Sequence, residues 1–318
     1  MTYREADLDR IRTVPVAHRR NKVDSSLLAT PPDGDRSFAA FLASLPDVLA
    51  ARDLRAVIDA VAAAARAHRG VVLLVGGHVI KVGLGPLVRT LLARRVVTHV
   101  ALNGAAAIHD FELAAFGGTS EDVESGLSDG SFGMAEETGA EMNAAIRAAA
   151  AAGEGMGEGL ARALAARGSL PGREVSVLVA AHELGIPVTV HAAIGAEIIH
   201  QHPAADGAAI GATSHRDFRR LAGSLPTLHQ GGVVLNLGSA VVLPEVFLKA
   251  LTIARNLEDG RPTHFVAADF DMQRHYRPRL NVVQRPTRAG GTGYLLTGHH
   301  ELLLPMLVWG VLELLGAG

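Results

Sequence analysis

The sequence predicts an α/β protein built on an open, doubly wound and mostly parallel sheet with helices on both faces. Short apolar runs bounded by glycine alternate along the chain with segments of helical pattern, which is typical of βαβ units. Hydrophobic residues make up 48% of the 318 residues, so the chain has enough apolar material for a large core.

The chain is expected to consist of an arm followed by one domain. Residues 1–36 are polar and contain Pro31, Pro32 and Gly34, which favours an extended arm that wraps the body of the protein or a neighbouring subunit. Residues 37–318 are expected to form a single α/β domain that begins with an alanine-rich helical pattern.

The strands of this domain are predicted at its apolar, largely β-branched runs. These runs cover residues 71–75, 96–102, 187–190, 233–237, 264–269 and 293–297. Helical patterns lie between several of them, and an apolar helix is expected to close the chain. The glycine-rich segment GEGMGEG at 153–159 separates two helical patterns, so we expect a flexible hinge or lid there.

The composition excludes several classes of function. The 30 basic and 32 acidic residues give a net charge of −2, without the basic surplus of nucleic-acid or anionic-membrane binding. The absence of cysteine excludes disulfides, thiol nucleophiles and cysteine zinc sites. The N-terminus lacks the apolar core of a secretory signal, and the longest apolar stretch, 302–315, is shorter than the about 20 residues that span a bilayer. We therefore expect a cytoplasmic protein with a small-molecule ligand.

Ligands of such sheets bind beyond the carboxyl ends of the strands, where loops lead into helices. Four loops after predicted strands, at 76–85, 103–110, 191–202 and 237–244, are rich in glycine, alanine, histidine or polar residues. The topology and the loop composition thus point to one shared site.

The first of these loops is the candidate for phosphate binding. Gly76 and Gly77 would let the backbone approach a pyrophosphate, but the spacing is not GxGxxG, and a tight turn explains the pair equally well. Lys81 is either a clamp for a phosphate or carboxylate or a solvated lysine.

Histidines supply the candidates for acid–base chemistry and for metal binding. His109 and Asp110 follow a strand as an acid–base pair, with a helix cap as the alternative role of Asp110. Glu197, His200 and His202 would be the ligands of a metal-dependent hydrolase, but ordinary polar loop positions are favoured and no metal is expected.

A serine nucleophile is not expected. GLSDG at 126–130 matches the GxSxG string of a nucleophile elbow, yet a polar, acidic segment precedes it instead of the strand that this motif requires.

The order of the segments resembles a known family. The resemblance lies in GGHVIKVG at 76–83, NGAAAIHD at 103–110, GIPV at 185–188, GVVLNLGSA at 232–240 and the ending GHHELLLPMLVWGVL. From Val71 onwards the chain resembles deoxyhypusine synthase and its prokaryotic relatives, which are Rossmann-like, NAD-dependent and usually tetrameric.

The resemblance implies a site as well as a fold. It implies NAD contacts at Gly76, Gly77, His78, Lys81, Asn103, Gly104, Gly238 and Ser239. Catalytic roles are expected for His109, Asp110 and His299, and substrate contacts for His191, Glu197, Arg285 and Arg288. A homo-oligomer, dimer or tetramer, is expected as well.

The chain departs from the family where the family's chemistry takes place. The family uses a lysine in an SWGK-type motif to form an imine, but Lys249 is the only lysine after Lys81, and RPTRAGG at 285–291 lies where that motif would be. Arginine is a poor imine former, so deoxyhypusine synthase activity is not expected. Arg285 and Arg288 would instead suit an anionic substrate.

These observations favour an NAD-dependent enzyme that acts on an unknown small molecule. A non-catalytic nucleotide- or metabolite-binding protein of the same fold is the alternative, and a metal-dependent hydrolase is the third hypothesis.

Overall fold

A parallel sheet forms the centre of the protein, as predicted. The computed structural model describes residues 3–32 and 34–316. Its strands are β1 (Val71–Val75), β2 (His99–Asn103), β3 (Val188–His191), β4 (Val233–Leu237), β5 (Val266–Asp271) and β6 (Thr292–Thr297). All neighbouring strands pair in parallel, in the order β3-β2-β1-β4-β5-β6. All six predicted strands are present, and the doubly wound α/β fold is confirmed.

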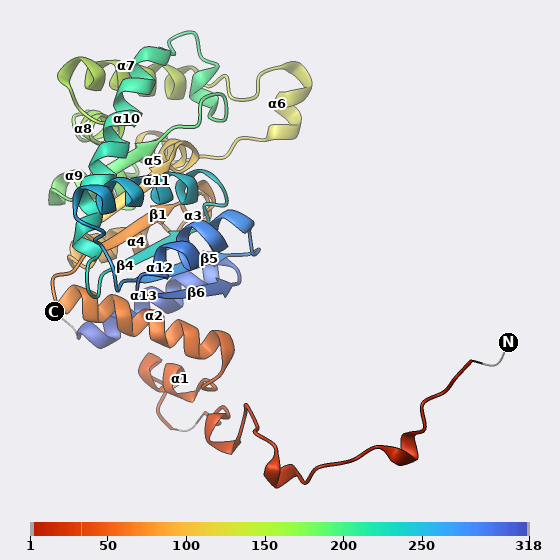
Figure 1. Cartoon of the computed structure of the whole chain (residues 1–318). Coiled ribbons are helices and arrows are strands. Elements are labelled where there is room, and N and C mark those ends of the chain that lie inside the picture. The colour runs from red at the N-terminus through yellow and green to blue at the C-terminus, as the bar shows by residue number, and fades with distance from the viewer. Residues whose placement is uncertain (1–2, 33, 317–318) are drawn as a thin grey trace.

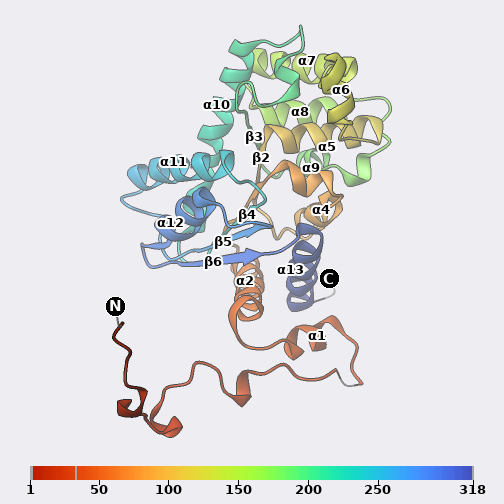
Figure 2. The ribbon, with the colours of Figure 1, turned by 90° about the vertical axis from the view of Figure 1, so that its right-hand side faces the viewer.

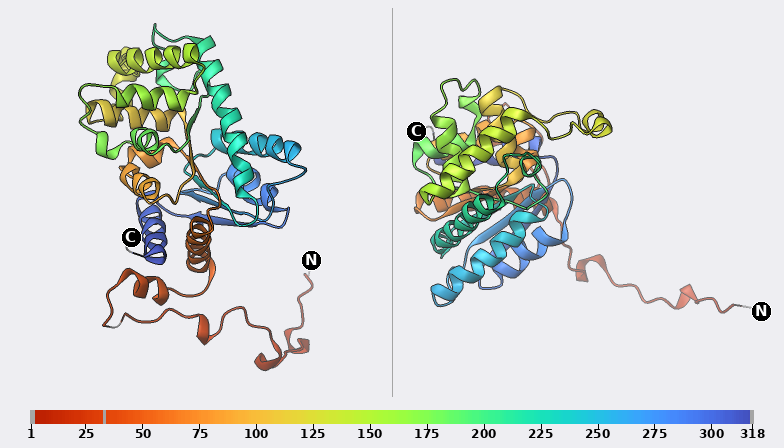
Figure 3. Two further views of the ribbon diagram at one scale, coloured as in Figure 1. Left: turned by 90° about the vertical axis from the view of Figure 1, so that its left-hand side faces the viewer. Right: turned by 90° about the horizontal axis from the view of Figure 1, so that it is seen from above.

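Helices cover both faces of the sheet (Figures 1, 2 and 3). One face carries α2 (Leu49–Arg66), α3 (Gly77–Lys81), α4 (Gly85–Ala93), α5 (Gly104–Phe116), α7 (Glu136–Ala152), α8 (Met156–Ala165), α9 (Val177–Leu184) and α13 (His300–Leu315). The other face carries α10 (Gly207–Ser224), α11 (Val242–Leu257), a π-helical segment at Pro278–Gln284 and α12 (Arg285–Thr287). Two apolar clusters, one on each face, make up the core.

The chain reverses its winding direction between β1 and β4. It leaves β1 towards β2 and leaves β4 towards β5, so the loops after these neighbouring strands diverge at a topological switch point. Gly76 N donates to Leu237 O at 2.9 Å, and a side chain at Gly76 would lie 2.2 Å from the carbonyl oxygen of Gly238. The absence of a side chain at Gly76 therefore lets the two loops touch.

The glycine-rich segment 153–159 packs tightly, so the expectation of a hinge or lid is wrong. Gly153 ends α7 with a φ of 71°, and α8 starts within the segment. A Cβ on Gly157 would lie 2.3 Å from Val188 O in β3, and one on Gly159 would lie 2.3 Å from the Cβ of Ala149 in α7. Because these glycines have no side chain, the backbone of α8 packs directly against β3 and α7.

The N-terminal arm lies away from the sheet (Figure 1). Its described residues, 3–32 and 34–36, are almost all exposed and form short 3-10 turns before α1 (Phe38–Ser44). Thr30 N donates to Ser44 O at 2.9 Å, which attaches the end of the arm to α1. Within the described residues, no helix is long and apolar enough to cross a membrane.

The packing of the glycine-rich segment predicts the effect of a single methyl group. Gly157→Ala should lower the free energy of unfolding by about 1–3 kcal/mol, because the new Cβ meets backbone that has no room to shift. Gly211→Ala in α10 is the matched control, since nothing lies within 4 Å of its Cβ. It should raise the free energy of unfolding by about 0.5–1 kcal/mol. Denaturant titration measures both, and equal behaviour of the two variants would contradict the tight packing.

Candidate functional site

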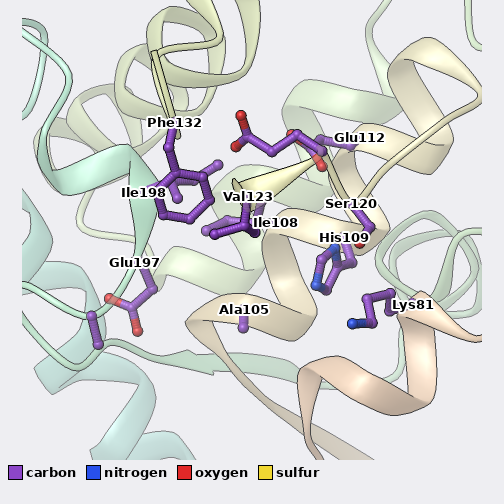
Figure 4. Close-up of a pocket in the computed structure, with 12 residues that line it drawn as sticks. Lys81, Ala105, Ile108, His109, Glu112, Ser120, Val123, Phe132, Glu197 and Ile198 are labelled. Carbon is purple, nitrogen blue, oxygen red and sulfur yellow. The ribbon is translucent and has the colours of Figure 1, made fainter. Parts of the chain in front are cut away.

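A cavity of about 240 Å³ opens beyond the carboxyl ends of β1 and β2. Its lining comes from α3, α5, the segment after α5 and the loop after β3: Lys81, Ala105, Ile108, His109, Glu112, Ser120, Glu121, Val123, Phe132, Ala196, Glu197 and Ile198. Figure 4 shows Glu197 on one side of the cavity and His109 with Lys81 on the opposite side. Apolar side chains lie between the two polar sides.

The start of α5 forms the floor of the cavity. Asn103 caps this helix, since its Oδ1 accepts the N–H of Ala106 at 2.9 Å. A Cβ on Gly104 would lie 2.3 Å from the carboxyl carbon of Glu197. The missing side chain at Gly104 therefore lets the Glu197 carboxyl lie against the first turn of the helix.

Glu197 is the carboxyl group of the cavity that titrates near neutrality. Its residue is 8% exposed, and burial raises its pKa to about 7, although the N–H of Ala193 donates to Oε1 at 2.9 Å. Its Oε2 is buried without a hydrogen-bond partner in the described part of the chain. His200 Nδ1 lies 3.1 Å from Oε2 but already accepts the N–H of Gly195, so the contact is not an ordinary ion pair. Glu197 is therefore available in both its protonated and its ionised form.

His109 faces Glu197 across the cavity as a neutral imidazole. Its Nδ1 lies 2.8 Å from the hydroxyl oxygen of Thr119. Desolvation lowers its pKa, and the nearby Lys81 and His78 lower it further. A neutral histidine next to a lysine is suited to accept a proton at neutral pH.

A second polar group lies at the switch point, in the carboxyl-terminal parts of β4 and β5 and at the start of α13. Asn236 Nδ2 donates to Asp269 Oδ1 at 2.7 Å, and burial raises the pKa of Asp269 to about 7. His300 lies with its Nε2 3.0 Å from Phe270 O, whereas its Nδ1 is buried and unpartnered among the described residues, as is Asn236 Oδ1. The ring of His78 lies next to that of His300, with centroids 5.5 Å apart and the ring planes tilted by 56°. Since α3 carries both His78 and Lys81, it connects this group to the cavity.

The predicted residues of the cofactor loops lie at this edge of the sheet, and packing explains several of them. A Cβ on Gly77 would lie 2.9 Å from that of Ala105, and one on Gly238 would lie 2.8 Å from His300 Nε2. Ser239 Oγ accepts the N–H of Leu243 at 3.2 Å near the start of α11. The conformation of these loops is thus explained by close contacts between their backbone and neighbouring groups.

Asp110 has the capping role that the sequence left open, so its assignment as a catalytic residue is corrected. It is 1% exposed, and its carboxylate accepts hydrogen bonds from Ser176 Oγ, Val177 N and Leu178 N at 2.6–3.0 Å. These bonds hold the start of α9 rather than a ligand.

The assignment of His299 as a catalytic residue is also corrected. It is the exposed N-cap of α13 and lies 3.6 Å from Glu301, while the buried histidine at this position is its neighbour His300.

The structure separates three of the four expected substrate contacts from the cavity. His191 is 2% exposed and bonds to Thr189 Oγ1 at 3.0 Å, and burial lowers its pKa to about 3, so it is a structural histidine. Arg285 bonds to Asn281 Oδ1 at 2.7 Å, and Arg288 lies beyond it on the way to the start of β6. Neither arginine lines the cavity, so neither supports an anionic substrate there.

The expected metal ligands do not converge. His202 packs against Gly139 in α7, where a Cβ would lie 2.3 Å from its ring, while His200 lies beside Glu197. Across residues 3–32 and 34–316, no group of three histidine or acidic side chains is arranged to hold a metal ion. The hypothesis of a metal-dependent hydrolase therefore has no structural support.

Sequence reasoning missed Glu112, Thr119, Glu121 and Phe132. Glu112 follows His109 by one helical turn, and this spacing alone could have found it. The other three lie on the irregular segment between α5 and α7, where no periodicity predicts which side chains point inwards.

The fold and the site together define an α/β protein with the strand order of dinucleotide-binding folds and an acid–base cavity at the carboxyl edge of its sheet. No family model matches the chain, and a search of the curated proteins found no match.

Solved structures of similar fold were found. A conserved LOR/SDH protein from Methanococcus maripaludis S2 is 13% identical with a TM-score of 0.51, and the alignment covers 89% of this chain and 73% of that one. A protein described as a deoxyhypusine synthase, from Entamoeba histolytica, is 12% identical with a TM-score of 0.48, over 86% of this chain and 92% of that one.

A third structure is AgrE in complex with ornithine and NAD⁺. It is 16% identical with a TM-score of 0.48, over 83% of this chain and 34% of that one, so the chain spans about a third of AgrE. At these identities the comparisons show the fold alone.

The raised pKa of Glu197 predicts a pH-dependent cost in stability. Between pH 4.5 and about 7 the unfolded chain has lost the Glu197 proton while the folded chain retains it, so the free energy of unfolding falls as the pH rises. Glu197→Gln lacks this titration.

The variant should therefore gain stability relative to the native protein from pH 4.5 to about 7, with a constant difference above that range. Denaturant titrations at a series of pH values measure the difference, in which the titrations of Asp217 and Asp269 cancel. A difference that does not change with pH would show that the Glu197 pKa is normal.

Proposed function

We propose that the protein is an NAD-dependent enzyme that acts on a small molecule held in the cavity. The observation that carries this proposal is the pair of groups on opposite walls: Glu197, whose pKa burial raises to about 7, and His109, whose pKa burial lowers so that it is a neutral imidazole. A substrate between them would have a proton acceptor on one side and a carboxyl group on the other.

The switch point is the proposed place of the cofactor. The order β3-β2-β1-β4-β5-β6 is that of the classic dinucleotide-binding sheet, in which the cofactor crosses the edge between β1 and β4. Two buried acceptors there, Asn236 Oδ1 and His300 Nδ1, have no partner in the described chain. They fit a ligand that is rich in hydroxyl and amide donors, such as a dinucleotide.

The side chains of the cavity would supply proton transfer and orientation. NAD⁺, when bound, supplies a hydride acceptor. His109 would remove a proton from a substrate hydroxyl or amine, and Glu197 would exchange a proton with the opposite end of the substrate. Lys81 adds a positive charge beside His109, and the apolar side chains of Val123 and Phe132 would exclude water.

Calorimetric titration with NAD⁺ and NADH is the direct test of the cofactor. Protein freed of co-purified ligand should bind one or both forms with a Kd in the micromolar range, as is common for enzyme ligands (on the order of 1 μM to 1 mM). Hydrogen exchange should slow in residues 76–83 and 236–241 when NAD⁺ is added, because these loops meet at the switch point.

Residues 289–291, which contact the segment before β5 at the opposite edge of the sheet, are the internal control and should exchange unchanged. A folded protein that binds neither form of NAD would contradict the proposed function and favour a non-catalytic protein with another ligand.

Variants of the two cavity residues test the chemistry. With a substrate found by screening amines, amino acids and carboxylates for NADH formation, Glu197→Gln and His109→Asn should each lower kcat by about 10²- to 10⁴-fold. Arg288→Ala should leave kcat unchanged because Arg288 does not line the cavity. Full activity in either cavity variant would remove that residue from the mechanism.

We also propose that the chain forms a homo-oligomer in the cytoplasm. Large apolar side chains are exposed along the arm and on α13, among them Leu8 at 70%, Leu302 at 62% and Trp309 at 58%. Such surface is often covered in an assembly. Sedimentation velocity of the full chain tests this proposal, and a monomer at micromolar concentration would contradict it.

A further inference from the structure

The segment between α5 and α7 reaches back over the cavity. We call residues 117–134, which include α6 (Val123–Asp129), the flap; α6 extends away from the body in Figure 1. Gly117 starts the flap with a φ of 80°, and no atom lies within 4 Å of the Cβ position of Gly118. The flap nonetheless contributes part of the cavity wall, including Val123 and Phe132.

One residue of the flap connects a carboxylate to the cavity histidine. Thr119 Oγ1 donates its hydrogen to Glu112 Oε2 at 2.5 Å. The same oxygen lies 2.8 Å from His109 Nδ1. A threonine hydroxyl has one hydrogen, so Thr119 can only accept from His109, and the imidazole proton must lie on Nδ1.

The other imidazole nitrogen is then the basic one. His109 Nε2 has no hydrogen-bond partner in the described chain and points into the cavity, on the side of Lys81 (Figure 4). A neutral imidazole with its proton on Nδ1 presents a lone pair at Nε2.

We propose that Glu112 and Thr119 are positioning residues that hold His109 in the Nδ1-protonated tautomer. Docking of the flap thereby prepares His109 to act as the general base in the cavity. Because Thr119 belongs to the flap, movement of the flap away from α5 disconnects His109 from Glu112. The proton then redistributes to Nε2, the position that a free neutral imidazole favours. The catalytic consequence rests on the proposed function of His109, but the tautomer does not.

We call the chain of hydrogen bonds from Glu112 through Thr119 to His109 the relay. The contacts on both sides of the relay support this arrangement. Glu112 Oε1 accepts a second hydrogen bond from Thr138 Oγ1 in α7 at 3.0 Å, which fixes the carboxylate from the side opposite the flap. The far end of the flap docks through Gln201 Nε2, which donates to Phe132 O at 3.1 Å. Within the flap, Glu121 accepts the N–H of Gly133 at 3.0 Å. The flap is therefore attached to the body at both of its ends, with the relay at one of them.

Two threonines provide a matched pair of variants. Thr119→Val and Thr138→Val each remove a hydroxyl donor to Glu112 and keep a β-branched side chain, but only Thr119 contacts His109. Thr119→Ser retains the hydroxyl, and Glu112→Gln removes the charge of the carboxylate.

The experiment is nitrogen NMR of the full chain with ¹⁵N-labelled histidine, without NAD or substrate, with the His109 signals assigned by their loss in His109→Asn. In the native protein, Thr119→Ser and Thr138→Val, His109 should show a protonated Nδ1 and an unprotonated Nε2. In Thr119→Val the populations should shift by more than half towards the Nε2-protonated tautomer. Glu112→Gln should shift them in the same direction.

An Nδ1-protonated His109 in Thr119→Val, or an Nε2-protonated one in the native protein, would overturn the proposal. Neither result would bear on NAD binding, so this failure is distinct from failure of the proposed function. Once a substrate is known, Thr119→Val should lower kcat by about 10- to 100-fold without a matching change in KM, as removal of such supporting groups does elsewhere. Thr119→Ser should restore most of that loss.

Discussion

All six strands of the sheet point in the same direction, and the remaining features of the site depend on this constraint. Parallel pairing puts the carboxyl ends of β1 to β6 at one edge, so every loop that leaves a strand there is next to another such loop. Lys81 and His109 follow β1 and β2, and Glu197 follows β3. These three residues are distant in sequence, yet they line one cavity because their strands are neighbours.

Whether a buried carboxyl group at this edge can act on a ligand depends on the hydrogen bonds that it already accepts and on the space beside it. Asp217 and Glu197 both have pKa values raised to about 7 by desolvation. Asp217 Oδ2 accepts the N–H groups of Gly157 and Val190 at 2.8 Å, which joins α8 to β3, and its side chain is not exposed. Glu197 faces a cavity instead. A raised pKa therefore identifies a candidate acid or base only when the geometry also provides room for a ligand.

The same distinction separates the histidines of the chain. His99 and His191 are buried on the sheet, both within 3.0 Å of the Thr189 hydroxyl, and burial lowers their pKa values to about 4 and about 3. They remain neutral and belong to the core. His109 is half-buried, has one nitrogen bonded to the flap and has the other open to the cavity.

By itself the sequence determined the sheet, because six short apolar runs, several of them next to glycine, are a local property that the sequence pattern reveals. It also placed Lys81, His109 and Glu197 in loops that follow strands, which was enough to include them in the site. The sequence could not show that Asp110 and His191 have structural roles outside the cavity, because the direction of a side chain depends on which helix packs beside it. Only the tertiary structure decided that Asp110 caps α9, that Arg285 and Arg288 do not line the cavity, and that the flap brings Thr119 to His109. These features depend on contacts between segments that are distant in the chain, and no local sequence pattern encodes such contacts.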